Sequence, residues 1–449
     1  MSDNLINVQN KGISYPQDFS INKLLFTTTA GSIDLKKLIV ELSYYEDMFS
    51  FVTSGHLTIL DGQGFIEILQ LAGNEYLEID YSKTVGGPSN KNTFRVYKIG
   101  NRLPTANPSI NIYTLYFCSE ELLLSEQTKV TKSYVGTKIS DIISNILSEN
   151  LKISSSRINV IEETTGVYDF VVPRFKPFET ISWLSTYARP KTGGTVGADM
   201  LFFETKDGYN FRSIKSMFSK TPSITYKSQL KNLPVEDAQE KIFTVLDYEF
   251  TKTQDVLQNI SSGMLANKLI SIDPLKRSYN VTTFNVNNSE SDNNIGTLKN
   301  RLGKTQTESY DAVVKVATGN ANQKNVPYIK EREGSVAQDI FIEAYVPNRT
   351  SEINLANYIS AKITVPGNPL LVVGDTINFN LLSQRNTSNN TRKDLDVYYS
   401  GKYLITAVRH TIRADEKYQT ILEIIKEKTE RKLPDNDSSS VVWQKLEKQ

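Results

Sequence analysis

The sequence predicts a mainly β protein in which two β-rich segments flank a small α+β domain, with a further insertion near the middle. Runs of β-branched and aromatic residues, separated by glycine turns, dominate the first 130 residues and the stretch after residue 352. Between them, apolar residues recur with helical spacing. The 23 tyrosines and 19 phenylalanines favour β-structure and broad interfaces.

Length and charge exclude several classes of protein. The 449 residues correspond to about three domains. With 51 basic and 50 acidic residues, the chain lacks the basic excess of a general nucleic-acid binder. No run approaches the roughly 18 apolar residues of a membrane span, and the N-terminus does not resemble a signal peptide. A single cysteine, Cys118, excludes an internal disulfide framework and a CxxC zinc site. We therefore expect a soluble chain made in a cytoplasm.

The first segment, residues 1–130, is predicted to consist of strands. Residues 55–71 form two β-rich runs around Asp61-Gly62-Gln63-Gly64, which predicts a hairpin. Residues 76–82 alternate in polarity, so one face of that strand should be apolar. Residues 110–118 are apolar on both faces, as in a strand covered on each side. This spacing favours an antiparallel sheet or barrel.

Residues 131–225 are predicted to form a small α+β domain. An amphipathic helix is predicted over 136–151, because its apolar residues recur at intervals of three and four. A second helix is predicted from Pro177 to a point before Pro190. Residues 199–214 should form a hairpin. The apolar stripe of the first helix consists of Ile139, Ile142, Ile143, Ile146 and Leu147.

The remaining chain is predicted to alternate between regular and polar stretches. Residues 237–274 begin as a strand and continue as helix and extended chain, whereas 280–300 are rich in Asn and Ser. That stretch is either a flexible surface loop or an ordered insertion that contacts a partner. A helix that feeds a strand follows over 352–367, then a hairpin-like pair over 368–383. Two strands at 400–413 and 417–428 precede a polar tail, whose apolar cluster is Val441-Val442-Trp443.

The sequence contains no specific catalytic or ligand-binding pattern. HExxH, GxSxG and Walker A motifs do not occur, and His56 and His410 lie 354 positions apart, which makes a poor metal site. Cys118 lies in an apolar strand, where a cysteine packs as a small hydrophobe. Glu162-Glu163 is best interpreted as a solvated pair, and 291–300 lacks the spacing of a calcium loop. A lysozyme-like carboxylate dyad cannot be identified from spacing, so a hydrolase remains an alternative.

His410 is the residue whose role decides between an enzyme and a structural protein. It lies in the middle of the strand at 400–413. On alternation, Thr406, Val408 and His410 share one side, and Ile405, Ala407 and Arg409 the other. A neutral imidazole donates one hydrogen bond and accepts another. Without a second histidine, a cysteine or a placed carboxylate nearby in the sequence, His410 is interpreted as a structural residue that holds neighbouring chain segments together.

Three C-terminal stretches resemble the signature of baseplate hub proteins of contractile-tailed bacteriophages, a family related to the hub part of type VI secretion spike proteins. They are "ITVPGNPLLVVGDTINF", "SGKYLITAVRHTI" and "YQTILEII". Stretches from about residue 40 onward are similar to the earlier domains of the same family. The resemblance implies a structural motif, and no catalytic, cofactor-binding or metal-binding residue. The residues of this motif are Gly367, Gly374, Asp375, Gly401, Tyr403, His410, Tyr418 and Thr420.

The resemblance also implies a domain plan. It comprises a first tail-tube-like antiparallel β-barrel over 1–130, a small α+β domain over 131–225, and a second barrel split between 226–275 and 335–430. An insertion domain would occupy 276–334, and a polar C-terminal tail 431–449.

The implied function is that of a baseplate hub. A homotrimer would present six barrels in a pseudo-sixfold ring that adapts a sixfold tail tube to a threefold central spike, around a lumen for the tape measure and DNA. The implied partners are the central spike protein, tail-tube or tube-initiator proteins, the tape-measure C-terminus and baseplate wedge proteins. No cofactor and no sequence-specific nucleic-acid binding are expected. The particle would be assembled in the host cytoplasm and the protein would reside in the virion tail. The alternatives are the hub of a tailocin or secretion particle, and a tail-associated peptidoglycan hydrolase.

Overall fold

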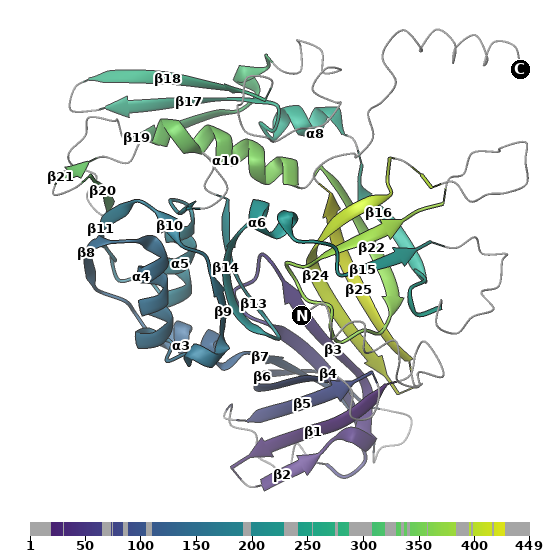
Figure 1. Ribbon diagram of the computed structural model, residues 1–449. Helices are drawn as coiled ribbons and strands as arrows, with labels where there is room; N and C mark the ends of the chain where they lie inside the picture. Colours follow the sequence, from purple (N-terminus) through teal and green to yellow (C-terminus); the bar gives the residue numbers. More distant parts are fainter. Residues whose placement is uncertain are drawn as a thin grey trace, which may run out of the picture.

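A computed structural model describes the arrangement of most of the chain (Figure 1). The described residues are 19–29, 31–64, 73, 75–83, 89–104, 110–191, 199–228, 241–253, 255–273, 277–286, 308–318, 329–333, 336–338, 342–356, 358–382, 395–396, 398–414 and 417–426. The fold is mainly β, as the sequence predicts, with large antiparallel sheets and a smaller helical part.

The N-terminal strands form a first β-unit, with the order β3-β4-β7-β6-β5-β1-β2. All neighbours in this order are antiparallel. Its members are β1 (Ser20–Thr28), β2 (Gly31–Asp34), β3 (Ile39–Asp47), β4 (Ser54–Asp61), β5 (Tyr76–Ser82), β6 (Ser89–Pro104) and β7 (Asn111–Cys118). Strands from both ends of the order contribute to one apolar core, so the sheet curls around it. Leu77, Ile79 and Tyr81 are buried there, which confirms the predicted alternation.

A second β-unit comes from two distant stretches of the chain. Its strands are β15 (Ile224–Lys227), β16 (Asp247–Lys252), β22 (Ile359–Pro366), β23 (Thr376–Asn380), β24 (Gly401–Arg413) and β25 (Lys417–Lys426). The order is β16-β22-β25-β24-β23-β15, in which only β15 and β23 run parallel. This strand order matches β3-β4-β7-β6-β5-β1 of the first β-unit, although the last pair is antiparallel there (β5–β1) and parallel here (β23–β15).

The two β-units are joined into a single 13-stranded sheet, because β24 also pairs with β3. This pairing runs antiparallel from Ala407 opposite Asp47 to Arg413 opposite Glu41. Figure 1 shows β3 and β24 lying between the lower and the upper groups of strands. The chain thus contains its own β-unit-to-β-unit junction.

The α+β domain lies beside this sheet. Its helices are α3 (Glu120–Gln127), α4 (Ile139–Asn145), the π-helix η2 (Ile146–Asn150), α5 (Pro177–Ser185) and α6 (Ile214–Ser219). Its strands are β8 (Ser133–Thr137), β9 (Ile158–Ile161), β10 (Thr164–Thr165), β11 (Val167–Val171), β12 (Arg189–Pro190), β13 (Met200–Thr205) and β14 (Gly208–Ser213). The predicted helical stripe from Ile139 to Leu147 is buried in the core of this domain, and β13 and β14 form the predicted hairpin.

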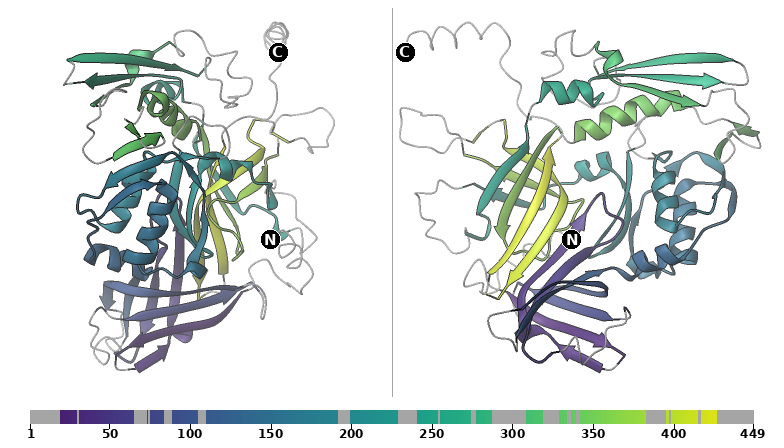
Figure 2. Two further views of the ribbon diagram at one scale, coloured as in Figure 1. Left: turned by 60° about the vertical axis from the view of Figure 1, so that its left-hand side comes forward. Right: turned by 180° about the vertical axis from the view of Figure 1, so that it is seen from behind.

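A third body covers one end of the molecule. The three-stranded sheet of β17 (Ala266–Asp273), β18 (Ser278–Asn285) and β19 (Val314–Thr318) packs on α10 (Ile342–Ala356), and α8 (Val256–Ser261) precedes it. In Figures 1 and 2, α10 lies between this sheet and the α+β domain. Tyr345 near the start of α10 is buried in the α+β core, and Ala356 at its end joins the core of the second β-unit.

The structure corrects several predicted segments. Strand β17 was expected in the second barrel but pairs with β18 and β19. Strand β20 (Ile329–Glu333) was expected in the insertion but pairs with β11 of the α+β domain. Its other neighbour is β21 (Val336–Gln338), which follows the predicted end of the insertion. Helix α10 begins ten residues before the predicted helix. These differences arise because pairing between distant strands leaves no trace in local sequence patterns.

The predicted hairpin over 368–383 is also wrong, because this stretch contributes one strand, β23, which pairs with β15 and β24. The predicted hairpin over 55–71 is described only in part. Its first run forms β4, which pairs with β3 and β7, and its second run falls within 65–72, which lie outside the described residues. The Asn-rich residues 287–300 and the tail with Val441–Trp443 are likewise outside the described residues.

None of the helices in the described part of the chain combines the length and the apolar character that crossing a bilayer requires.

Candidate functional site: the junction of the β-units

His410 lies at the centre of the junction between the β-units. It is opposite Tyr44 of β3 on one side and Thr420 of β25 on the other. Its Nδ1 atom is 2.9 Å from the Tyr418 hydroxyl and 3.2 Å from the Thr420 hydroxyl. The ring stacks on Tyr44 at a centroid distance of 6.0 Å and lies 5.9 Å from the ring of Tyr81. His410 therefore joins tyrosines of the first β-unit to hydroxyls of the second.

Burial sets the charge of His410. The side chain is fully enclosed, which lowers its pKa to about 3, and the charge of Lys206 acts in the same direction. The imidazole is therefore neutral near pH 7.

Gly367 and Thr420 complete the arrangement around His410. The amide of Gly367 donates to the carbonyl of Tyr418 at 2.9 Å, and the amide of Asn368 donates to the Thr420 hydroxyl at 3.1 Å. A Cβ on Gly367 would lie 2.1 Å from Cδ1 of Tyr418. The turn can therefore pass over the tyrosine ring only because this residue is glycine. Four of the eight predicted motif residues thus meet in one place.

Gly374 and Asp375 lie in a turn at the other end of the second β-unit. Gly374 has a φ of +85°, a conformation that favours glycine. Its amide donates to the carbonyl of Ile405 at 3.0 Å, and the amide of Ile405 donates back to the Asp375 carbonyl at 2.9 Å. The Asp375 carboxylate pairs with Lys220 of the α+β domain at 2.8 Å. This turn therefore fixes β24 and ties the second β-unit to the α+β domain.

The remaining predicted motif residues lie at the start of β24, away from His410. Gly401 has a φ of +130° and stands opposite Phe379. The Tyr403 hydroxyl donates to the carbonyl of Tyr399 at 2.6 Å. These two residues shape the entry of the strand rather than the junction.

Glu46 on β3 connects three parts of the molecule. Its Oε1 atom accepts hydrogen bonds from the amide of Lys206, at 2.7 Å, and from the Tyr44 hydroxyl, at 3.1 Å. Its Oε2 atom accepts one from the amide of Val373 at 3.2 Å. Lys206 is in the β13–β14 turn and Val373 is in the second β-unit. Burial raises the pKa of Glu46 to about 7, although the two backbone amides oppose that rise.

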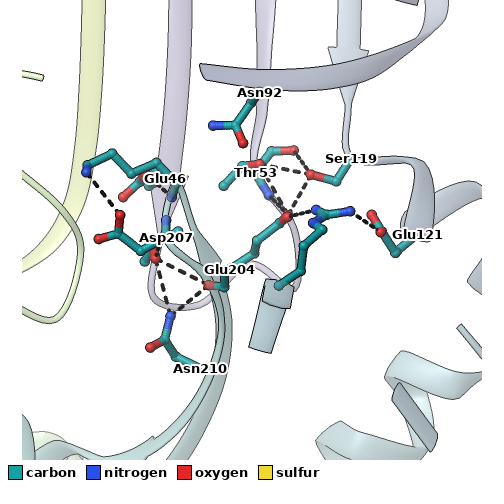
Figure 3. A network of polar contacts seen from close by, with 12 residues as sticks. Glu46, Thr53, Asn92, Ser119, Glu121, Glu204, Asp207 and Asn210 are labelled. Carbon is teal, nitrogen blue, oxygen red and sulfur yellow. Dashed lines mark hydrogen bonds and ion pairs between the residues drawn. The ribbon is translucent and has the colours of Figure 1, made fainter. Parts of the chain in front are cut away.

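Glu204 forms a second buried carboxylate contact, between the α+β domain and the first β-unit (Figure 3). Its Oε2 atom accepts from the amide of Thr53 at 2.8 Å and from the Ser119 hydroxyl at 2.6 Å. Its Oε1 atom lies 2.6 Å from Arg157, which also pairs with Glu121. The side chain of Glu204 is 3% exposed, so these contacts replace solvent almost entirely.

The opposite face of the junction is polar. Glu41 of β3 pairs with Arg409 at 3.1 Å and with Arg413 at 3.2 Å, both on β24, and His56 approaches it at 3.5 Å. Burial raises the pKa of Glu41, but the hydrogen bond from Ser43 and the two arginines outweigh it, so the net shift is downward. The junction is thus held by aromatic and buried carboxylate contacts on one face and by ion pairs on the other.

The groups considered for catalysis have structural partners instead. Burial raises the pKa of Cys118 to about 11, so the thiol is protonated. Glu162 accepts from Arg212 and from the amide of Ser213, whereas Glu163 pairs with Lys138 and Lys191. The two carboxylates therefore do not share a site. Within the described part of the chain, no three His, Cys, Asp or Glu side chains are grouped as metal ligands would be.

The pH dependence of stability should report the neutral state of His410. The unfolded pKa is roughly 6.5, so as the pH falls the unfolded chain binds this proton and the folded chain does not. The contribution of His410 is therefore complete above about pH 6.5 and decreases by about 1.4 kcal/mol per pH unit toward pH 3. Glu46 acts in the opposite direction between about pH 4.3 and 7, because its folded pKa is raised. We expect the stability advantage of the wild type over His410→Gln to shrink between pH 6 and pH 5 in urea unfolding. A constant difference would contradict a buried neutral histidine.

Sequence reasoning found His410 but missed Glu46 and Glu204. Each is one of 50 acidic residues. Glu46 directly follows the Leu42-Ser43-Tyr44-Tyr45 stretch and occupies an inward position of β3, with Leu42 and Tyr44. An acidic residue at an apolar position of a strand is a signal that could have identified it. For Glu204, which ends the apolar run Met200–Phe203, the signal is weaker.

Comparisons with known proteins support the resemblance found in the sequence. No protein-family model matches the chain. A curated relative, a probable baseplate hub protein of Vibrio phage KVP40, is 22% identical over 423 residues, covering 91% of this chain and 94% of its own. The chain thus resembles a baseplate hub protein over nearly its whole length.

Solved structures of low sequence identity share the fold. The 43 kDa tail protein of prophage MuSo2 from Shewanella oneidensis superposes with a TM-score of 0.52 at 9% identity, covering 90% of this chain and 98% of that protein. A tail protein from Neisseria meningitidis MC58 gives a TM-score of 0.51 at 7% identity, with 91% and 97% covered.

Proposed function

We propose that this chain is a baseplate hub of a contractile phage tail and that it acts as a homotrimer. The observation that carries the proposal is the pair of β-units with one strand order, fused edge to edge in a single sheet. Three copies would present six such β-units. A ring of this kind matches a sixfold tail tube on one side and a threefold spike on the other, and a closed ring leaves no free strand edge.

The proposed partners follow from that position. The central spike protein would bind on the threefold side, and tail-tube or tube-initiator proteins on the sixfold side. Baseplate wedge proteins would surround the ring, and its lumen would hold the end of the tape measure and pass DNA. The protein would reside in the virion tail. The role is structural rather than enzymatic, and the assignment of Cys118, Glu162 and Glu163 to structural contacts supports this.

Native mass spectrometry of the purified chain, alone and together with its candidate spike protein, tests the trimer. The monomer mass is 50.6 kDa, so a species of about 152 kDa, three times that mass, is expected. Addition of three spike chains to that species would further support the proposal. A chain that stays monomeric at all concentrations and with the spike would overturn it, and cell-wall zymography would then test the hydrolase alternative.

A further inference from the structure

Around one bulge the two β-units agree residue by residue, and not only in strand order. In the β6–β7 pair the register shifts between Val96 and Lys98, and in the β24–β25 pair it shifts between Ile405 and Ala407. Aligning these two bulges places Val96 on Ile405. The correspondence ends at Gly100, because β6–β7 has a second shift between Gly100 and Leu103 that β24–β25 lacks. An independent hydrogen bond agrees with this alignment. The amide of Val96 donates to the Glu75 carbonyl at 3.1 Å, and the amide of Ile405 donates to the Asp375 carbonyl at 2.9 Å.

The neighbouring strands follow the same alignment. Before the bulge, Arg95 stands opposite Tyr76 of β5, and its counterpart Leu404 stands opposite Thr376 of β23. On the far side, β3 corresponds to β16. Tyr45 is opposite Ser54 in the first β-unit, and Lys252 is opposite Ser360 in the second. Ser54 in turn stands opposite Cys118 and Ser360 opposite Ile425, and these two residues are also counterparts in the alignment.

The two β-units differ in how the strand beyond the bulge is covered. Past Ile405, the edge of β24 is occupied by β3, beginning with the amide of Met48, which donates to the Thr406 carbonyl at 2.9 Å. Past Val96, the same edge of β6 pairs with no strand among the described residues. Likewise β3 has partners on both edges, whereas β16 is paired only with β22 in the described part of the chain. Within the described residues, the two counterpart strands therefore each have an edge without a partner strand: β6 past Val96, and the edge of β16 away from β22.

Building on the trimer proposed above, we infer that β16 of one copy pairs antiparallel with the free edge of β6 in the next copy, repeating the β3–β24 junction between chains. The occupant of this edge is a second copy of the chain, because the molecule already contains the same contact between equivalent strands. Each copy would offer β16 at one end and β6 at the other. Such head-to-tail contacts close a ring when the rotation permits.

Exposed apolar side chains occur where this junction would cover them. Tyr97 at the bulge of β6 is 52% exposed, whereas its counterpart Thr406 is 6% exposed beneath the existing junction. Beyond β3, Met48 is buried in the core of the second β-unit. Beyond β16, Val256 and Leu257 are exposed, Leu257 by 80%. Val256 and Leu257 directly follow Asp255, which the alignment places at the position of Met48, so both would lie near the junction between chains.

The alignment predicts a specific pair for cross-linking. Arg409 stands opposite Tyr45 in the existing junction, and their counterparts are Gly100 and Lys252. The double variant Gly100→Cys/Lys252→Cys should therefore form disulfides between copies under mild oxidation. Non-reducing gels would then show covalent dimers and closed trimers. A Cβ at Gly100 would lie 3.1 Å from Cε2 of Tyr116 and 3.8 Å from Cε of Lys98, both side-chain atoms that can shift, so this variant should fold.

Three controls make the result specific. Tyr45→Cys/Arg409→Cys should oxidise within one chain and leave the mass monomeric. Ser32→Cys/Lys252→Cys places one thiol on β2 at the other end of the sheet and should give no closed trimer. The single cysteine variants show whether the buried Cys118 contributes. If Gly100→Cys lowers the melting temperature strongly, Ile99→Cys/Thr253→Cys tests the next pair along the same register.

The outcomes separate this inference from the trimer itself. One outcome is that native mass spectrometry shows trimers and the Tyr45–Arg409 pair oxidises, but neither the Gly100/Lys252 nor the Ile99/Thr253 pair forms cross-links. This outcome would overturn the β6–β16 pairing but not the trimer. Monomers without cross-links, alone and with the spike, would overturn both. Cross-linked closed trimers that depend on both cysteines would establish the pairing.

Discussion

Replacing Glu204 with alanine should lower the free energy of unfolding by about 3–5 kcal/mol, the range for removing one partner of a buried ion pair. The substitution leaves the Thr53 amide and the Ser119 hydroxyl, which donate at 2.8 Å and 2.6 Å, without their acceptor in a buried place. Arg157 also loses its ion pair with Glu204, but it keeps Glu121 as a partner and is partly exposed. The lost ion pair therefore contributes less to the change than the two unsatisfied donors. Urea unfolding at pH 7, followed by tryptophan fluorescence, measures the change.

Glu163→Ala is the matched control for this prediction. Glu163 also pairs with two cationic side chains, and they lower its pKa to about 2, chiefly through the hydrogen bond from Lys138. It lies on the surface, however, where solvent screens ion pairs. We expect a small change for Glu163→Ala. Equal losses in the two variants would show that the buried position of Glu204 does not matter.

Replacing Gly367 with alanine should cost about 3 kcal/mol, the upper end of the range for overpacking a tight core. The added Cβ would lie 2.1, 2.2 and 2.6 Å from three atoms of the Tyr418 ring. The ring cannot turn away freely, because its hydroxyl is 2.9 Å from His410 and its backbone carbonyl accepts from Gly367 itself. The added methyl group would therefore strain the contacts of Tyr418 with His410, which belong to the junction of the β-units. Thermal unfolding with calorimetry measures the loss.

Gly62→Ala provides the comparison for Gly367→Ala. A Cβ at Gly62 meets only Ile110, at 4.0 Å, so a methyl group fits there. The melting temperature of Gly62→Ala should stay near that of the wild type. The steric argument fails if Gly367→Ala melts at the same temperature as Gly62→Ala.

The sequence allowed much of the local structure to be predicted. Periodicity identified the helix from Ile139, whose apolar stripe is fully buried, and alternation identified β5. Alternation also placed Val408 and His410 on a buried face of β24. Ile405 is the exception, because the bulge at Thr406 turns it into the core instead of leaving it beside Ala407. A bulge adds a residue without a sequence signal, so alternation fails across it.

The contacts that join the parts could not be predicted in the same way. The hydrogen bond between Glu204 and Thr53 joins residues 151 positions apart, and that between Glu46 and Val373 joins residues 327 positions apart. No sequence spacing predicts these two contacts, because each forms only when separately folded parts of the chain dock. The resemblance of the C-terminal stretches pointed to His410, Tyr418 and Thr420 as a group. It did not show that the group lies against Tyr44 and Tyr81 of the first β-unit.

The β3–β24 pairing also has a consequence during synthesis on the ribosome. Glu41 and Arg413, which end this ladder, are 372 positions apart. At about 5–20 residues per second, β3 waits roughly 20–70 s before its partner strand exists. Throughout that interval the nascent chain exposes an unpaired edge strand, the kind of surface that invites pairing with other chains. Fragments that end before residue 400 would keep this edge uncovered permanently, and would be expected to engage chaperones or aggregate rather than accumulate as a folded N-terminal β-unit.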